Sequence, residues 1–213
     1  GIKKSSNKSK IIVLLDDDVD VKKNYFKNIL KIFNNKPGAL GVAGFVYGPK
    51  DSKNEPIEYL LKRIFFLGYL ENKERARITS AYGNTYPIKL SKVINSKWLS
   101  GVNMAYKKEI FKEQMFDNNL IGYTVAEDID FTYRLYKKYS NSLFITPYAK
   151  IFHRVSNGER YPTEKLSYIN QIDHFYFNFK NLNKGIKQKS IFIWCLLGIS
   201  VLRTINLLNR PNK

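Results

Sequence analysis

The sequence has little cysteine, little histidine and few acidic side chains. Its single cysteine, Cys195, excludes an internal disulfide and is expected to be inert packing in an apolar stretch. The sequence has only two histidines. It has 18 acidic side chains and 36 lysines and arginines, which gives a formal net charge of +18. Such an excess of positive charge favours anionic partners, namely nucleic acid, acidic lipid surfaces or pyrophosphate-linked substrates.

The chain also lacks an apolar run that is clearly long enough to cross a bilayer. Residues 190–202 form an apolar stretch of thirteen residues that ends at Arg203, whereas a spanning helix needs about 20. If Arg203 snorkels, the stretch extends to about residue 208, so a spanning helix and an interfacial helix both stay open. No signal peptide, internal repeat or low-complexity linker is visible.

A short strand pattern ends in three carboxylates. Residues 11–15 predict an interior strand, and Asp16, Asp17 and Asp18 follow directly. Ligands of open α/β sheets bind at the C-terminal edge of the strands. Clustered carboxylates there suit Mg²⁺ or Mn²⁺ carrying a phosphorylated ligand. A solvated acidic turn or a helix N-cap would explain the same residues.

Two later features have the chemistry to complete such a site. Residues 126–135 predict a helix with Glu127 and Asp128 in its first turn, where acids complement the helix dipole or supply a general base. His153 follows a predicted strand at 145–152, which places it at a sheet edge as well. A lone histidine is commonly structural, but its position after two acidic clusters favours a ligand.

Helices and strands alternate along the rest of the chain. Helical spacing is expected at 24–33 and 57–70, and a helix start at 107–111. Strands are expected at 39–46 and at 98–105, the latter with a tight turn at Ser100-Gly101, and a polar loop at 71–97. After residue 161, aromatic side chains at helical spacing alternate with lysines. Core packing or a membrane interface explains this stripe, which contains Tyr168, Ile172, Phe175, Tyr176 and Phe179.

Taken in order, these motifs resemble a family 2 glycosyltransferase. The resemblance covers roughly residues 1–180 and rests on residues 14–19 (with a DXD motif), 98–109, Phe116-Asp117, 127–130 with Arg134, and His153. It implies an α/β fold of the GT-A type, a Rossmann-like mixed sheet flanked by helices, with a C-terminal helical membrane-proximal segment. It also implies an N-terminal truncation, because the family's enzymes have a longer N-terminal part that holds the nucleobase.

The resemblance divides the chain into three parts and assigns site residues. Residues 1–160 would be the C-terminal portion of the catalytic domain, 161–189 a basic aromatic helical segment, and 190–209 an apolar membrane-associated or transmembrane helix. The implied roles are catalytic base for Asp128; metal ligands for Asp18 and His153; donor binding for Asp16, Asp17, Ser100 and Gly101; and acceptor binding or orientation for Glu127, Trp98 and Arg134.

The implied activity is metal-dependent inverting transfer of one sugar, of the hexosyltransferase type. A nucleoside-diphosphate sugar would be the donor, a glycan or lipid-linked hydroxyl the acceptor, and Mn²⁺ or Mg²⁺ the cofactor, in surface polysaccharide biosynthesis. Processive synthases of this superfamily carry a Gln-x-x-Arg-Trp motif, which this sequence lacks, so single transfer is favoured. The implied location is an anionic membrane surface of a bacterial cell, with the active site on the cytoplasmic side.

Three other interpretations stay open. Residues 16–20 fit the Asp-Asp-x-x-Asp pattern of isoprenoid synthases, but those motifs lie within long helices and occur in pairs. A basic nucleic-acid-binding module fits the charge, but the cations are spread along the chain without a binding motif. A non-catalytic membrane scaffold derived from a glycosyltransferase would have no need to keep Asp18, Asp128 and His153.

Overall fold

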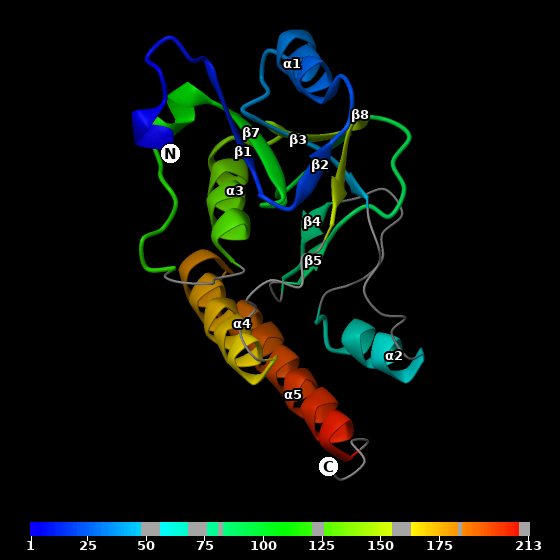
Figure 1. The fold of residues 1–213 in the computed structure, drawn as a ribbon. Helices are drawn as coiled ribbons and strands as arrows, with labels where there is room; N and C mark the ends of the chain where they lie inside the picture. Colours follow the sequence, from blue (N-terminus) through cyan, green and yellow to red (C-terminus); the bar gives the residue numbers. More distant parts are fainter. Residues whose placement is uncertain are drawn as a thin grey trace.

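The computed structural model describes residues 1–47, 56–67, 76–80, 83–120, 126–154, 163–182 and 185–208. Within them a mixed sheet lies between helices, and a further group of helices extends from this body (Figure 1). The strand order is β1-β7-β3-β8-β2, with β6 also paired to β8; β3 and β8 are parallel and the other pairs antiparallel. The strands are β1 (Ile11–Leu15), β2 (Val19–Val21), β3 (Gly41–Tyr47), β6 (Ile94–Asn95), β7 (Asn103–Lys107) and β8 (Leu143–His153).

The sheet has a hydrophobic core on each face, because successive side chains of a strand point to opposite sides. Val42 and Ala43, neighbours in β3, belong to different cores. Helix α1 (Tyr25–Asn35) buries Ile29 and Phe33 in one core, and helix α3 (Glu127–Lys138) buries Phe131 and Leu135 in the other. The predicted mixed α/β sheet flanked by helices is thereby confirmed.

A bulge in β8 directs the end of this strand toward β2. The pairing of β3 with β8 shifts after Gly44, where residues 147–149 of β8, beginning with a proline, have no counterpart in β3. Glycine is needed at position 44, because a Cβ there would lie 2.4 Å from the carbonyl oxygen of Ala149. Beyond the bulge β8 runs beside β2, and His153 pairs with Val19.

The C-terminal helices form a hairpin. Helix α4 (Thr163–Phe177) continues as the π-helical turn η3 (Asn178–Leu182), and α5 (Ile186–Leu208) follows. The two helices lie side by side (Figure 1), with the Phe192 ring of α5 5.4 Å from His174 and 5.2 Å from Phe175 of α4. The predicted long apolar C-terminal helix is confirmed, and its 23 residues make it the one helix of the described chain that is long and apolar enough to cross a membrane. The three-part domain division stays a prediction.

Several local predictions were wrong. Strand β1 is terminal rather than interior in the described sheet, and of its residues only Ile12 is buried. The strand predicted at 98–105 begins only at Asn103 as β7, and the helix start predicted at 107–111 is a 3₁₀ turn, η2 (Lys108–Lys112). Helix α2 (Pro56–Ile64) ends before residue 70, and residues 68–70 lie outside the described residues. The predicted loop at 71–97 contains β4 (Arg77–Ile78), β5 (Asn84–Thr85) and β6, while a further 3₁₀ turn, η1 (Ile2–Lys4), precedes the sheet.

Candidate functional site

The three consecutive aspartates form the turn between β1 and β2. The backbone N–H of Asp16 donates to the carbonyl of Val102 (3.2 Å), and the N–H of Arg154 donates to the carbonyl of Asp18 (3.0 Å). These two bonds tie the turn to the segment before β7 and to the end of β8. Strand pairing therefore brings the first predicted acidic cluster to His153, as the sequence order anticipates.

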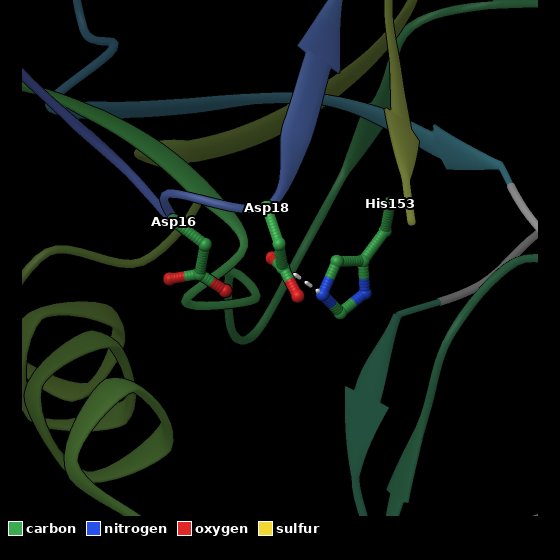
Figure 2. A group of neighbouring side chains, drawn as sticks. All are labelled: Asp16, Asp18 and His153. Carbon is green, nitrogen blue, oxygen red and sulfur yellow. Dashed lines mark ion pairs between the residues drawn. The ribbon is translucent and has the colours of Figure 1, made fainter. Parts of the chain in front are cut away.

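Asp16, Asp18 and His153 form a compact group of ligand atoms. One ligand atom from each residue lies within 4.8 Å of the others, and Nε2 of His153 is 3.0 Å from Oδ1 of Asp18 (Figure 2). Partial burial raises the pKa of Asp16; His153 opposes this rise, while the carboxylates of Asp18 and Asp17 add to it. Asp17 itself is exposed in the turn.

This donor set fits a divalent cation. Carboxylate oxygens suit Mg²⁺ and Mn²⁺, and a cation would relieve the repulsion between the neighbouring aspartates. The imidazole nitrogen is a better ligand for a transition metal than for Mg²⁺, which prefers oxygen. The cluster Asp16, Asp18 and His153 can therefore bind a metal such as Mn²⁺.

Asp128 lies in the first turn of α3 and is held by backbone groups. Its Oδ2 accepts a hydrogen bond from the N–H of Gly101 (2.6 Å), and its Oδ1 accepts one from the N–H of Ile129 (2.6 Å). Burial raises the pKa of Asp128 to about 7, although both backbone bonds oppose the rise. A carboxyl group that titrates near neutral pH is suited to general base chemistry.

An acidic side chain of α4 joins this region, which sequence analysis did not predict. Partial burial, and then the carboxylates of Asp16 and Asp173, raise the pKa of Glu127. Asp173 is only 5% exposed, and it comes from the C-terminal helical hairpin. A single acid within an aromatic stripe gives no local signal of a site, so only the tertiary structure reveals it.

Arg134 belongs to a buried polar network one turn further along α3. Its Nε donates to Asp130 (2.8 Å) and its terminal nitrogen to the carbonyl of Met115 (2.9 Å). Lys180 of η3 also binds the Asp130 carboxylate, at 2.9 Å, and it contacts Asp117. This network joins α3 to the C-terminal helices and engages the guanidinium that sequence analysis assigned to the acceptor.

The remaining predicted site residues lie in the segment before β7. Trp98 is 6% exposed in the core, and its Nε1 donates to the carbonyl of Thr85 (3.0 Å). Ser100 accepts the N–H of Asn103 through its carbonyl (3.2 Å). The structure thus brings Gly101 and Asp128 together, while Trp98 packs inward and away from direct solvent contact.

Comparisons with known proteins find a distant likeness in structure alone. No protein-family model matches the chain, and no curated protein is detectably similar in sequence. A structure of GalNAc-T7 with UDP, GalNAc and Mn²⁺ is 12% identical over 68% of this chain and 27% of that chain, with a TM-score of 0.48. Mannosyl-3-phosphoglycerate synthase from Rubrobacter xylanophilus is 14% identical over 84% and 49%, with a TM-score of 0.43. S. aureus TarS 1–349 is 16% identical over 92% and 56%, with a TM-score of 0.41.

The chain thus spans between about a quarter and just over half of the length of these solved chains. Scores of this size do not assign it to a family.

Proposed function

We propose that this chain is part of an inverting glycosyltransferase of the GT-A type, which moves one sugar from a nucleoside-diphosphate sugar to a hydroxyl of a glycan or lipid-linked acceptor. The observation that supports this best is the position of a candidate metal cluster near a carboxyl group of raised pKa. Asp16, Asp18 and His153 form the cluster, and Asp128 lies in the first turn of α3, next to Glu127, whose pKa Asp16 raises.

In this proposal Asp18 and His153 hold Mn²⁺ or Mg²⁺. A cation held there would supply the positive charge that offsets the charge developing on the departing diphosphate. Asp16 would contact the donor, at its ribose or beside the metal, and the exposed Asp17 would be a further donor contact. The backbone at Ser100 and Gly101 is a further proposed donor contact, and the lack of a side chain at Gly101 lets Asp128 approach, since a Cβ there would lie 3.3 Å from its Oδ2.

Asp128 is the proposed general base. Its carboxylate accepts the proton of the acceptor hydroxyl as that oxygen bonds to the anomeric carbon, and the bond from this carbon to the phosphate oxygen breaks with its electron pair going to the diphosphate. One displacement of this kind inverts the anomeric configuration and needs no enzyme nucleophile. The bonds from Gly101 and Ile129 keep both carboxylate oxygens oriented.

The other predicted residues act around this centre. Glu127, in the first turn of α3, orients acceptor or donor hydroxyls. Arg134 and Trp98 are positioning residues, because Arg134 is bonded to Asp130 and Trp98 to the carbonyl of Thr85.

The first experiment is thermal unfolding of the chain with Mn²⁺ and a panel of UDP, GDP, CMP and dTDP. We expect the nucleoside diphosphates to raise the melting temperature only when Mn²⁺ is present, and Asp18→Asn to lose this shift. Asp20→Asn is the matched control, because Asp20 is paired with Arg154 (2.8 Å) rather than with the cluster. Absence of a shift with every nucleotide, or an equal loss in both variants, would contradict the proposed donor site.

The base is tested separately, once the donor is known. Asp128→Asn should keep the Mn²⁺-dependent nucleotide shift and lose sugar transfer by a factor of about 10² or more. Transfer near the wild-type rate would reject Asp128 as the base without affecting the assignment of the metal ligands.

A further inference from the structure

Helix α2 exposes its apolar side. Ile57, Leu60 and Ile64 lie on one face of the helix and are 67%, 55% and 45% exposed. The ion pair between Glu58 and Lys62 is less accessible, with side chains 33% and 20% exposed. A helix at a water-facing surface normally buries its apolar stripe and exposes its charges. The apolar face is therefore at least as accessible as this ion pair, which indicates that it meets a non-aqueous partner.

The end of α2 is packed firmly against α5. Phe65, directly after α2, sits in the space that Gly198 leaves, since a Cβ at position 198 would lie 2.2 Å from the Cβ of Phe65. The ring centroids of Phe65 and Trp194 are 4.9 Å apart, and Nε1 of Trp194 donates to the carbonyl of Ile64 (2.9 Å). The exposed side chains of the two helices therefore adjoin where Ile64 and Trp194 meet.

Together these surfaces carry exposed apolar side chains from both helices. We define the apolar platform as seven exposed side chains on α2 and α5. These two helices lie at the end of the molecule remote from α1 (Figure 1). Basic side chains accompany it, because Arg63 of α2 and Lys187 and Lys189 of α5 are exposed. Apolar and basic side chains together match an anionic bilayer surface. The platform consists of Ile57, Leu60, Ile64, Ile193, Trp194, Leu197 and Val201.

The opposite side of α5 is unsuited to hydrocarbon. Near its C-terminal end Arg203 bonds to Gln171 (2.7 Å) and to the hydroxyl of Ser167 (3.1 Å), both in α4. A spanning α5 would carry this polar group into the bilayer with α4 attached, at a high energetic cost. A helix lying in the plane keeps its α4 side on protein and water and its other side on lipid.

We propose that α2 and α5 form one lipid-binding face that rests in the plane of an anionic bilayer, and that α5 does not span it. This inference is independent of the sugar-transfer reaction, so the two proposals fail separately.

Flotation with phosphatidylglycerol–phosphatidylcholine vesicles tests the face. The full chain should bind, and the pair Leu60→Asn with Ile64→Asn should weaken binding at least about tenfold, because two apolar side chains no longer leave water. The matched control is Phe26→Asn with Leu30→Asn on α1, whose side chains are 52% and 46% exposed, close to the values for α2. This control should bind as the unmodified chain does.

Three results would overturn the proposed face. The first is absence of vesicle binding by the full chain. The second is normal binding by the variant with Leu60→Asn and Ile64→Asn. The third is an equal loss of binding in the control with Phe26→Asn and Leu30→Asn. A lipid-free dimer that the α2 pair dissociates, without vesicle binding, would assign the platform to a second copy and reject the bilayer.

Quenching of Trp194 by brominated lipids tests the orientation. Trp194 lies eight residues into α5, about 12 Å along the axis at about 1.5 Å per residue, which is near the bilayer centre if α5 spans. Bromines near the headgroup should quench it more than bromines near the chain end. The reverse order would overturn the in-plane orientation. Trp194→Phe gives the contribution of the buried Trp98, to be subtracted.

Discussion

At the scale of single residues, Asp128 carries a cost in stability for its proposed role. Its surroundings disfavour the charged carboxylate, and the two backbone N–H groups only partly offset this. The folded state therefore holds the proton more tightly than the unfolded chain does, in which an aspartate has a pKa of about 3.9. The free energy of unfolding consequently falls as the pH rises from about 4 to about 7.

Asp128→Asn should be more stable than the unmodified chain at pH 8. Asparagine stays neutral and its one oxygen accepts the N–H of Gly101, but its amide nitrogen cannot accept the N–H of Ile129. At about 1.4 kcal/mol for each pKa unit, less the cost of this lost bond, the net gain is on the order of 1–3 kcal/mol. Urea unfolding at pH 5 and pH 8 measures it, and the variant should show the smaller difference between these conditions. A variant whose stability differs between pH 5 and pH 8 as much as that of the unmodified chain would contradict the raised pKa.

Asp20→Asn is the control for this comparison. The hydrogen bonds from Arg154 lower the pKa of Asp20, so its carboxylate is not disfavoured in the folded state. We expect this variant to gain no stability at pH 8.

At the scale of secondary-structure elements, the Asp130 network connects α3 with η3. Asp130 is 1% exposed and has two cationic partners, Arg134 and Lys180. Removing the shared Asp130 carboxylate leaves the two half-buried cations, Arg134 and Lys180, with fewer anionic partners. Breaking a buried ion pair in this way costs more free energy of folding than replacing the whole pair by apolar residues. The position of the proposed base in α3 therefore depends on the C-terminal helices.

Asp130→Asn should lower the free energy of unfolding by about 2–4 kcal/mol. The matched comparison is Glu113→Gln, which breaks an ion pair with Lys138 whose side chains are 45% and 56% exposed. An exposed pair of this kind contributes at most about 1 kcal/mol. Urea unfolding of both variants measures the difference, and equal losses would show that the network adds nothing to stability.

The elements that the sequence predicted well are those with a strong local pattern. The apolar runs of β1, β3 and β8 and the helical spacing of α1 predicted their approximate extents. Strands β4, β5 and β6 have two residues each and exist only through their partners, so no period could reveal them. Likewise, Trp98 and Leu99 resemble strand residues because they are buried, although they precede β7.

The candidate site was predictable only where the pairing of strands brings its residues together. Asp18 and His153 meet because β2 pairs with β8, which their order along the chain anticipated once the resemblance was recognised. Asp173 and Lys180 reach α3 only because the C-terminal helices pack against it. No residue spacing in the sequence indicates this tertiary contact.

At the scale of the whole molecule, a chain of net charge +18 surrounds a small acidic site. The cations attract anionic surfaces and diphosphates over a distance that salt shortens, whereas apolar contacts are little affected by salt.

Binding to phosphatidylglycerol–phosphatidylcholine vesicles should therefore weaken as NaCl rises from about 0.1 M to about 1 M, where the screening length falls from about 10 Å to about 3 Å. It should not vanish, because the apolar platform remains in contact with lipid. Flotation across a salt series measures this, with vesicles of pure phosphatidylcholine as the reference. Binding that disappears entirely would indicate a purely electrostatic attachment.

Helix α4 has a different neighbour on each side. One side contributes Asp173 to the acidic site, and the other packs Phe175 on Phe192 of α5. With α5 resting on a bilayer, α4 would fix the height of Asp128 above the lipid headgroups. Helix α4 would thereby select acceptors by their length. A lipid-linked acceptor would react only if the distance between its lipid and its free hydroxyl matched the height of Asp128 above the headgroups.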